Sequence, residues 1–224
     1  MSQSDEAIDD IMSGLRAQLP GADDPVILYT MRDVVRQLCR RGRVWKVEGK
    51  IPALRNIGAL RVSNISGFGE PIWVEAVTFR GRELLHGNFN PRIQEPKGGV
   101  TTSWHYEAPD RIYLDPILED PMPDDAFWVR AAVQPRLGAD PALSLSHVPA
   151  HVFTNNHETI SQGTLGFMMV MPGKPWSNGA LSATYIRRFL GMISAARVST
   201  DNSRGTDPRP RWRFPLPAAA WRRW

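Results

Sequence analysis

The sequence contains a single cysteine, no long apolar run and no leader pattern, and each scarcity excludes a class of protein. The one cysteine, Cys39, cannot form an internal disulfide, and its place among the apolar residues of a helical pattern predicts a buried thiol rather than a nucleophile. No apolar run approaches the roughly 18 residues of a membrane helix. Residues 1–6 lack the basic-then-apolar pattern of a signal peptide. We therefore expect a protein that is made in the cytoplasm and does not enter a membrane.

Motifs for catalysis or metal binding are also scarce. The sequence has no glycine-rich phosphate loop of the standard kind and no serine in a Gly-x-Ser-x-Gly elbow. His157 and Glu158 begin like the zinc-protease helix motif, but Ser161 takes the place of the second histidine, so two ligands cannot share one face. His147 and His151 have i, i+4 spacing, yet His147 falls in a connector. Surface or packed histidines are therefore predicted in place of a metal site.

A group of acidic residues could be read as a calcium loop or as a pair of catalytic carboxylates. Its members are Asp115, Glu119, Asp120, Asp124 and Asp125. The group lacks the alternating ligand spacing and the central glycine of the common calcium loop, and its prolines are typical of turns. A solvated hairpin end is the favoured interpretation. Since no site is supported, we predict a protein that is not an enzyme and has no cofactor.

The excess charge of the chain is concentrated at its C-terminal end. The 224 residues include 27 Lys and Arg against 23 Asp and Glu, a net charge of +4. Six of the arginines and two of the aspartates lie from Ser199 onward, which leaves 21 basic and 21 acidic residues in the remainder. A general nucleic-acid coat spreads basic residues over a folded face, so this distribution favours a tail that docks on a specific partner.

The N-terminal part predicts helices. Residues 1–24 carry apolar residues at helical spacing and are interpreted as an N-terminal arm, a short amphipathic helix that would be marginal alone. Asp24 and Pro25 form a good helix start, and Gly42 is a typical stop. Between them lies one apolar face, made of Leu28, Met31, Val34, Val35 and Leu38. We therefore predict a core-packed helix over residues 24–42.

From residue 43 to residue 135 the hydrophobic period changes to two, which predicts a β domain. Runs rich in Val, Ile, Trp, Tyr and Phe lie at 44–51, 59–65, 72–79, 100–106, 111–114 and 127–134, with turn segments at 67–71, 96–99 and 119–125. No helix of crossover length separates the runs. The sheet should therefore be mainly antiparallel, as a small sandwich or barrel. Residues 136–148 follow as a connector.

Helical periodicity returns in the last third, where we predict helices over residues 149–171 and 177–198. The small residues Ser161, Gly163 and Gly166 would let a neighbouring backbone come close, and Ser177 or Asn178 can cap the last helix. The turn between the two helices, here named the clasp, contains Pro172, Gly173, Pro175 and Trp176. The last helix carries an apolar stripe of Leu181, Tyr185, Phe189, Ile193 and Ala196. Residues 25–42 and 149–198 should form one helical domain, giving an α+β fold from which the sheet projects.

The segment 199–224 is interpreted as an extended tail that orders only when it docks. Its aromatic residues and its arginines are the types that most often carry interface energy. They are Arg209, Arg211, Trp212, Arg213, Phe214, Trp221, Arg222, Arg223 and Trp224. Burial of three tryptophans roughly offsets the entropy lost in ordering the backbone, so a preformed groove is required. The alternative is a nucleic-acid-binding tail that stacks single-stranded bases on tryptophan and holds phosphates with arginine.

Several segments occur in an informative order. RIYLDP at 111–116 precedes FWVRAAVQP at 127–135, and VP at 148–149 opens a helix. ISQGTL at 160–165 then leads through MPGKPWSN at 171–178 to FLGMISAAR at 189–197. This succession resembles the head-to-tail adaptor, or tail tubular, proteins of short-tailed bacteriophages. The resemblance extends in layout from about Leu28 to about Phe214 and is most specific over residues 160–197.

The resemblance implies a structural protein of the virion, made in the host cytoplasm, that acts in viral tail assembly and DNA ejection. Such adaptors form a ring, usually of twelve copies, beneath the portal protein and present their opposite face to the tail nozzle or hub. Genomic DNA passes through the lumen without sequence readout. Their C-terminal segments commonly insert into grooves of the portal, which implies a portal-docking role for residues 199–224. The helical domain would then build the ring.

Overall fold

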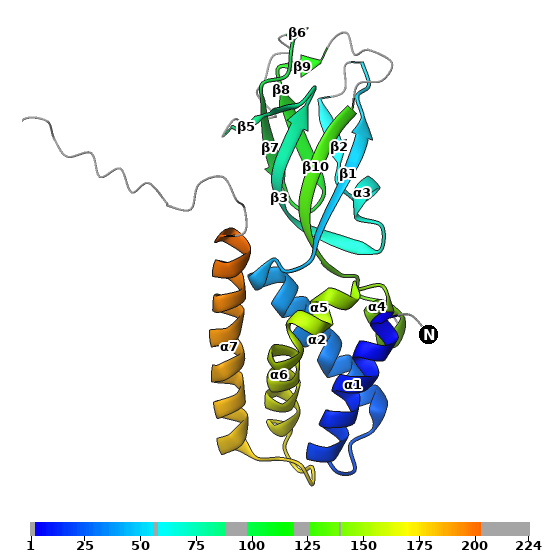
Figure 1. Ribbon diagram of the computed structural model, residues 1–224, viewed down its shortest axis with the longest axis vertical. Coiled ribbons are helices and arrows are strands. Elements are labelled where there is room, and N and C mark those ends of the chain that lie inside the picture. Colours follow the sequence, from blue (N-terminus) through cyan, green and yellow to red (C-terminus); the bar gives the residue numbers. More distant parts are fainter. Residues whose placement is uncertain (1–2, 56–57, 88–97, 119–125, 139, 203–224) are drawn as a thin grey trace, which may run out of the picture.

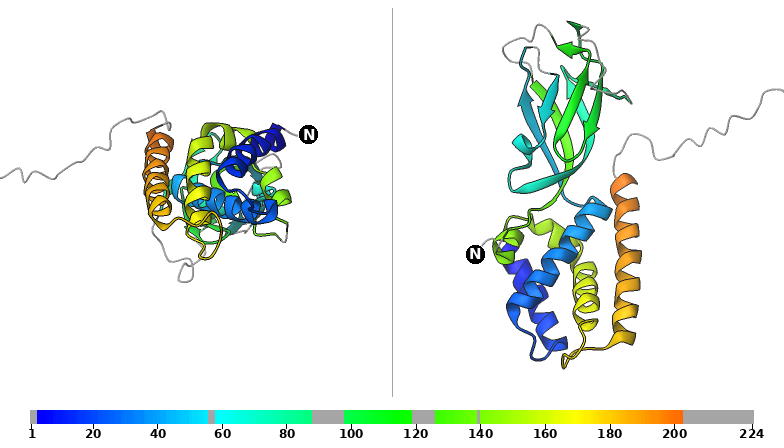
Figure 2. Two further views of the ribbon diagram at one scale, coloured as in Figure 1. Left: turned by 90° about the horizontal axis from the view of Figure 1, so that it is seen from below. Right: turned by 180° about the vertical axis from the view of Figure 1, so that it is seen from behind.

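The computed structural model describes residues 3–55, 58–87, 98–118, 126–138 and 140–202. Within these residues it contains seven helices and ten strands, and its sheets are mainly antiparallel. The predicted α+β class is therefore confirmed. The molecule is elongated, with a helical layer at one end and a β domain at the other (Figures 1 and 2).

The helical layer consists of six helices around one hydrophobic core. They are α1 (Gln3–Gln18), α2 (Asp24–Gly42), α4 (Pro141–Ser146), α5 (Ala150–Asn155), α6 (His157–Met169) and α7 (Gly179–Asn202). The central helix α2 packs against α4, α6 and α7, whereas α1 packs against α4, α5 and α6. The helical domain thus combines segments from both ends of the chain, as predicted.

The bounds of α2 agree with the prediction and have a clear local cause. Pro25 lies in the first turn, where its missing N–H costs no hydrogen bond. At the other end Arg43 adopts the left-handed region at φ 52°, and its N–H donates to the carbonyl of Cys39 at 2.9 Å. The predicted apolar face is buried, with Leu28 at its partly exposed edge.

Two segments outside the predicted helical domain belong to its core. The predicted arm contains α1, in which Ile11, Met12 and Leu15 are at most 2% exposed. Residues 136–148 were expected as a connector but include α4, whose N-terminus is capped by the Asp140 carboxylate accepting from the Ala142 N–H at 2.9 Å. The amphipathic helix predicted in the arm is present as α1, but its place in the helical core and the helix α4 in the connector were not predicted. Burial against other helices stabilises helices that are marginal alone.

The predicted helix over residues 149–171 is divided in two. The break lies at Asn156, whose side-chain amide donates to the Val152 carbonyl at 2.9 Å while its backbone leaves the helical region. Asparagine competes with helical hydrogen bonds in this way. The last helix, α7, runs to Asn202 and is therefore longer than the predicted 177–198.

The β domain is a sandwich of two four-stranded sheets with a small two-stranded addition. Its elements are β1 (Lys46–Pro52), β2 (Ala59–Arg61), α3 (Ser63–Ser66), β3 (Gly69–Phe79), β4 (Arg82–Glu83), β5 (Leu85–His86), β6 (Gly98–Gly99), β7 (Ser103–Glu107), β8 (Arg111–Asp115), β9 (Ile117–Leu118) and β10 (Ala126–Pro135). Sheet A has the order β1-β10-β3-β4 and sheet B the order β2-β8-β7-β5. Their inner side chains share one core, which includes Phe79, Phe127 and Trp104.

The strand predictions differ from the structure in several places. β3 begins at Gly69, inside the predicted turn 67–71, and β6 lies inside the predicted turn 96–99. Two further differences have a clear physical reason. Residues 59–65 were expected to be one strand, but β2 ends at Arg61 and the short helix α3 follows, because the Asp110 carboxylate accepts from the Ser63 hydroxyl at 2.7 Å. The second difference is that β5 pairs with β7, and β6 with β9, in parallel. The pairs comprise two residues each, too few to show a periodic signal.

The two domains are joined by β1 and β10, whose ends reach into the helical layer. Trp45, just before β1, and Val133 in β10 belong to the helical core, and the Val133 N–H donates to the Trp45 carbonyl at 2.9 Å. Val47 packs against both cores. The sandwich is therefore tied to the helical layer by packing as well as by the chain.

Candidate functional site

The sequence places the candidate docking residues in the tail, and α7 determines where that tail begins. All nine predicted docking residues, Arg209, Arg211, Trp212, Arg213, Phe214, Trp221, Arg222, Arg223 and Trp224, lie outside the described residues. α7 ends at Asn202 beside the junction between the helical layer and the sandwich (Figure 1). The last described residue, Asn202, therefore lies near the middle of the molecule's long axis (Figure 1).

The hairpin of α6 and α7 is packed closely because glycines face the partner helix. A Cβ atom on Gly163 would lie 2.7 Å from Val34 Cγ1 and 2.9 Å from Phe189 Cδ2. On Gly166 it would lie 3.1 Å from the backbone nitrogen of Ile186. The Ser182 hydroxyl also donates to the Gly166 carbonyl at 2.8 Å in a buried position. The predicted close approach of a neighbouring backbone is confirmed.

The clasp fixes the turn between these helices. The Asn178 N–H donates to the Met169 carbonyl and the Ser177 N–H to the Lys174 carbonyl, each at 3.0 Å. Gly173 adopts φ 72°, which favours glycine. The Asn178 side chain accepts from the Leu181 N–H at 3.1 Å, so Asn178 caps α7 as one of the two predicted candidates.

The four clasp residues differ in exposure. Pro172, Gly173 and Pro175 are exposed, whereas the Trp176 ring is half-buried against the helical core. The Lys174 ammonium lies 5.8 Å from the Trp176 ring centroid. The clasp, at the end of the hairpin far from the sandwich, is therefore attached to the helical core through Trp176, while its two prolines and its glycine are exposed.

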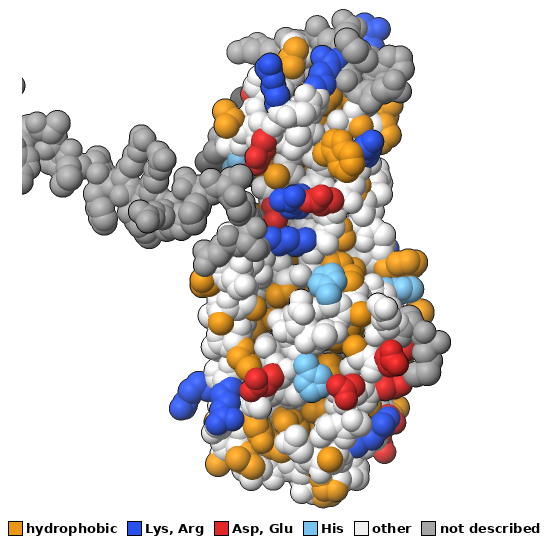
Figure 3. All heavy atoms as spheres, in the orientation of Figure 1, with side chains coloured by type: hydrophobic (Ala, Val, Ile, Leu, Met, Phe, Trp, Pro, Cys, Tyr) orange, Lys and Arg blue, Asp and Glu red, His pale blue; other side chains and the backbone are white. Residues whose placement is uncertain are grey.

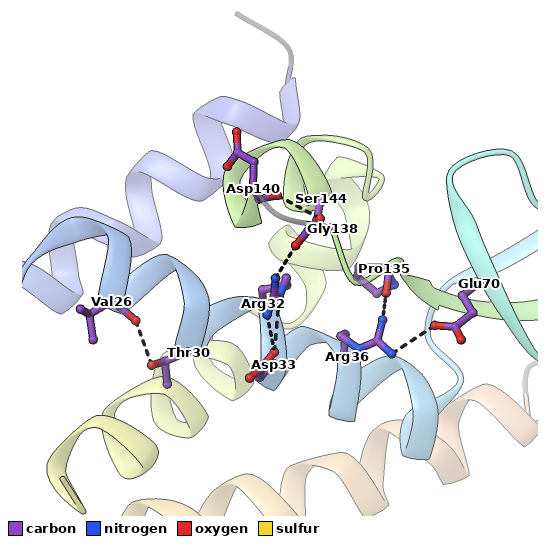
Figure 4. A network of polar contacts seen from close by, with 10 residues as sticks. All are labelled: Val26, Thr30, Arg32, Asp33, Arg36, Glu70, Pro135, Gly138, Asp140 and Ser144. Carbon is purple, nitrogen blue, oxygen red and sulfur yellow. Dashed lines mark hydrogen bonds and ion pairs between the residues drawn. The ribbon is translucent and has the colours of Figure 1, made fainter.

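A network of polar contacts lies at the junction between the domains (Figure 4). The Arg36 guanidinium donates to the Pro135 carbonyl and forms an ion pair with Glu70 at 3.1 Å. The Gln134 amide donates to the same Glu70 carboxylate at 2.9 Å. One turn earlier in α2, Arg32 donates to the Gly138 carbonyl at 3.1 Å. These contacts link α2 to β3 and to the segment after β10, which holds the sandwich in place on the helical layer.

Beside this network lies a groove of about 450 Å³ that the sequence did not reveal. The Arg43 guanidinium lies 4.2 Å from the Trp73 ring centroid, and Trp73 meets Tyr106 edge to face at 6.5 Å. Burial, with a smaller effect of nearby Asp110, raises the pKa of Tyr106 to about 12. The aromatic residues lie in strands whose alternation was recognised, but their meeting with α2 depends on tertiary placement.

The three histidines of the C-terminal region have different surroundings. His147 stacks on Phe68 with ring centroids 3.7 Å apart, His151 lines an open groove beside α7, and His157 lies 3.4 Å from Asp10. Glu158 and His157 are exposed. Within the described part of the chain, no group of three or more His, Cys, Asp or Glu residues could hold a metal ion.

The remaining candidates are Cys39 and the acidic group. Cys39 is fully buried, as predicted, and burial raises the pKa of its thiol to about 12, which keeps the thiol protonated at neutral pH. Asp115 ends β8, where its backbone carbonyl accepts from the Thr102 N–H at 3.1 Å. Glu119, Asp120, Asp124 and Asp125 lie outside the described residues.

The outer face of sheet A carries charged pairs and the exposed Trp128. Glu48 pairs with Arg130 across the strands, and the Lys46 ammonium lies 3.2 Å from the Glu75 carboxylate. The Lys50 ammonium lies 4.7 Å from the ring centroid of Trp128, which is 49% exposed. The pair of Glu48 and Arg130 is of the cross-strand kind that stabilises a solvated sheet face, whereas the Glu75 side chain is only 2% exposed. The face is therefore a polar surface of mixed charge.

None of the helices among the described residues combines the length and the apolar character that a membrane span requires. Comparison with known protein families finds no family model that matches the chain, and comparison with curated proteins finds no match.

Proposed function

We propose that this protein is a head-to-tail adaptor of a short-tailed bacteriophage. In this role a ring of copies, usually twelve, joins the portal protein to the tail nozzle or hub. Genomic DNA passes through the ring without sequence readout. The observation that carries the proposal is the hairpin of α6 and α7, since it contains the segment of strongest resemblance and leads directly into the Arg- and Trp-rich tail.

The arrangement of the domains supports this role. A connector needs two separated surfaces for two different partners, and here the helical layer and the sandwich lie at opposite ends of an elongated molecule. The close packing at Gly163 and Gly166 stiffens the helical end, while the junction network around Arg36 fixes the sandwich to it. A fixed orientation of the sandwich on the helical layer suits a protein that joins two assemblies.

The composition of the tail supports portal docking. Each tail combines tryptophan with arginine, the residues that most often dominate interfaces. Insertions that are weak individually become strong when many are presented in matching symmetry. A ring whose tails leave from beside the domain junction could engage a portal ring in this manner.

The proposal is tested by particles assembled without this protein. We expect DNA-filled heads that carry portals but no tails, and we expect purified protein added back to restore tail attachment. Complete tails on heads that lack the protein would refute the adaptor function.

The basic, aromatic composition of the tail also favours a second candidate, a nucleic-acid-binding protein. This function predicts tight binding of short oligonucleotides by the free protein, with a steep loss of affinity as salt rises. The adaptor function predicts weak binding. Fluorescence titration of a labelled single-stranded oligonucleotide at two salt concentrations separates the two functions.

A further inference from the structure

The outward face of α7 has no partner among the described residues, although it carries charge and apolar surface. α7 packs on α6 and α2, which leaves the opposite side of the helix uncovered. Arg187 and Arg188 are exposed there and make no ion pair with a described residue. Leu190 is 40% and Val198 58% exposed. Beside this face, where α7 meets the end of α2, Leu190 and Val198 line a mainly apolar groove of about 550 Å³ together with Ile193, Arg197 and Arg41 of α2.

The other side of the helical layer has the complementary character. Glu6 and Asp9 are exposed on α1, which packs on α4, α5 and α6. Glu6 lines a groove shared with α5 and α6, and Asp9 lies near Arg16 of the same helix. Beside α1, Leu143 on α4 is 58% exposed and Leu137, just before α4, is 66% exposed. An acidic surface with exposed leucines thus lies across the helical layer from a basic surface with an apolar groove.

The views of the molecule agree on this placement. α7 and α1 form opposite edges of the helical layer seen from the front, from below and from behind (Figures 1 and 2). In the space-filling view, basic side chains project at the edge formed by α7 with an acidic side chain beside them, and several acidic side chains lie near α1 with a basic side chain among them (Figure 3). Because the two surfaces differ, they cannot pair with themselves, but each matches the other on a second copy.

We propose that the outward face of α7 docks on the α1 and α4 surface of a second copy of this chain. Arg187 and Arg188 then face Glu6 and Asp9, and the leucines beside α4 cover the groove along α7. Such a head-to-tail contact repeats from copy to copy and closes into a ring when the rotation allows. Closure into a ring rests on the proposed adaptor function, whereas the contact itself rests on the two surfaces.

Charge reversal offers a direct test because the contact is heterologous. Arg187→Glu with Arg188→Glu makes both surfaces acidic, and Glu6→Lys with Asp9→Lys makes both basic. Each variant alone should repel its own copies, but a mixture restores opposite charges at every contact. A matched control, Arg61→Glu with Arg82→Glu, reverses two exposed charges on the sandwich.

Sedimentation velocity over rising protein concentration measures the association of full-length protein. We expect wild type and the control to form oligomers, each charge variant to associate about a hundredfold more weakly, and an equal mixture of the two variants to recover association to within about tenfold of wild type. Far-UV circular dichroism should be unchanged, since all four positions are exposed.

Three outcomes would overturn the docking assignment: wild-type association by both variants, a mixture that fails to associate, or wild type that stays monomeric at its highest soluble concentration. The adaptor function would survive each of them if particles lacking the protein still fail to join tails. Conversely, tails on such particles would refute the function and leave a measured α7 to α1 contact intact.

Discussion

Glycines at the crossing of α6 with its neighbours provide a test at the scale of single residues. Gly163→Ala would place a methyl group 2.7 Å from Val34 and 2.9 Å from Phe189, both fully buried. Overpacking costs about 1–3 kcal/mol, which outweighs the gain of about 1 kcal/mol in helix propensity. We expect urea unfolding to show a net loss of up to about 2 kcal/mol.

Gly14→Ala is the matched control, because a Cβ atom on Gly14 would meet nothing within 4 Å in helix α1. There the propensity gain acts alone, so stability should rise by about 0.5–1 kcal/mol. Equal effects of the two substitutions would contradict the close packing of the hairpin.

The ion pair between Arg16 and Asp24 predicts a pH dependence. The Arg16 guanidinium donates to the Asp24 carboxylate at 2.7 Å and holds the pKa of Asp24 below its ordinary value of 3.8. The contribution of this pair is therefore complete above that ordinary value and is lost as pH falls through the lowered pKa. An NMR titration should show the low pKa of Asp24 in wild type and its return to the ordinary value in Arg16→Gln. High salt should shrink the difference, because both groups are exposed.

At the scale of elements, the junction between α2 and the sandwich depends on Arg36. Arg36→Ala removes the ion pair with Glu70 and the hydrogen bond to the Pro135 carbonyl in a largely buried place. We expect the free energy of unfolding to fall by about 1–3 kcal/mol. Arg40→Ala, in the next turn and exposed, should change it by less than about 0.5 kcal/mol. Equal losses for the two variants would show that the junction contributes nothing specific.

Local signals in the sequence predicted several elements well. α2 spans the predicted residues, with Pro25 in its first turn, but the capping residues differ from those predicted: Asp23 is the N-cap and Arg43 adopts the left-handed conformation, whereas Asp24 and Gly42 are helical. The main strands and the α6–α7 hairpin followed from alternation and from small residues at helical spacing. Burial of α1 and the short helix α4 was missed, since α1 packs on α4, α5 and α6 and α4 packs on α1 and α2, all of them far away in the sequence.

The candidate site was less predictable than the fold. The groove where Arg43 meets Trp73 joins a helix end to a strand 30 residues later, and the outward charges of α7 and α1 lie nearly 180 residues apart in the chain. No periodic pattern or motif in the sequence predicts that Arg43 meets Trp73, or that the charges of α7 and α1 lie on opposite sides of the helical layer. The tail residues were identified from composition alone, and they remain a prediction.

At the scale of the whole molecule, the tail and the body should be separable. Truncation after Ser203 removes the predicted docking residues and leaves α7 and both hydrophobic cores intact. We expect unchanged circular dichroism and an unchanged unfolding midpoint, together with loss of binding to purified portal rings. A pull-down that is unaffected by the truncation would contradict docking by the tail while leaving the adaptor function open.

The most direct test of the adaptor function is an electron-microscopy reconstruction of purified virus particles at the vertex that carries the tail. The proposal predicts a ring of copies of this chain between the portal and the tail nozzle, with each elongated α+β molecule fitting the density. A vertex at which portal and tail meet directly, or at which another protein fills the position between them, would contradict it.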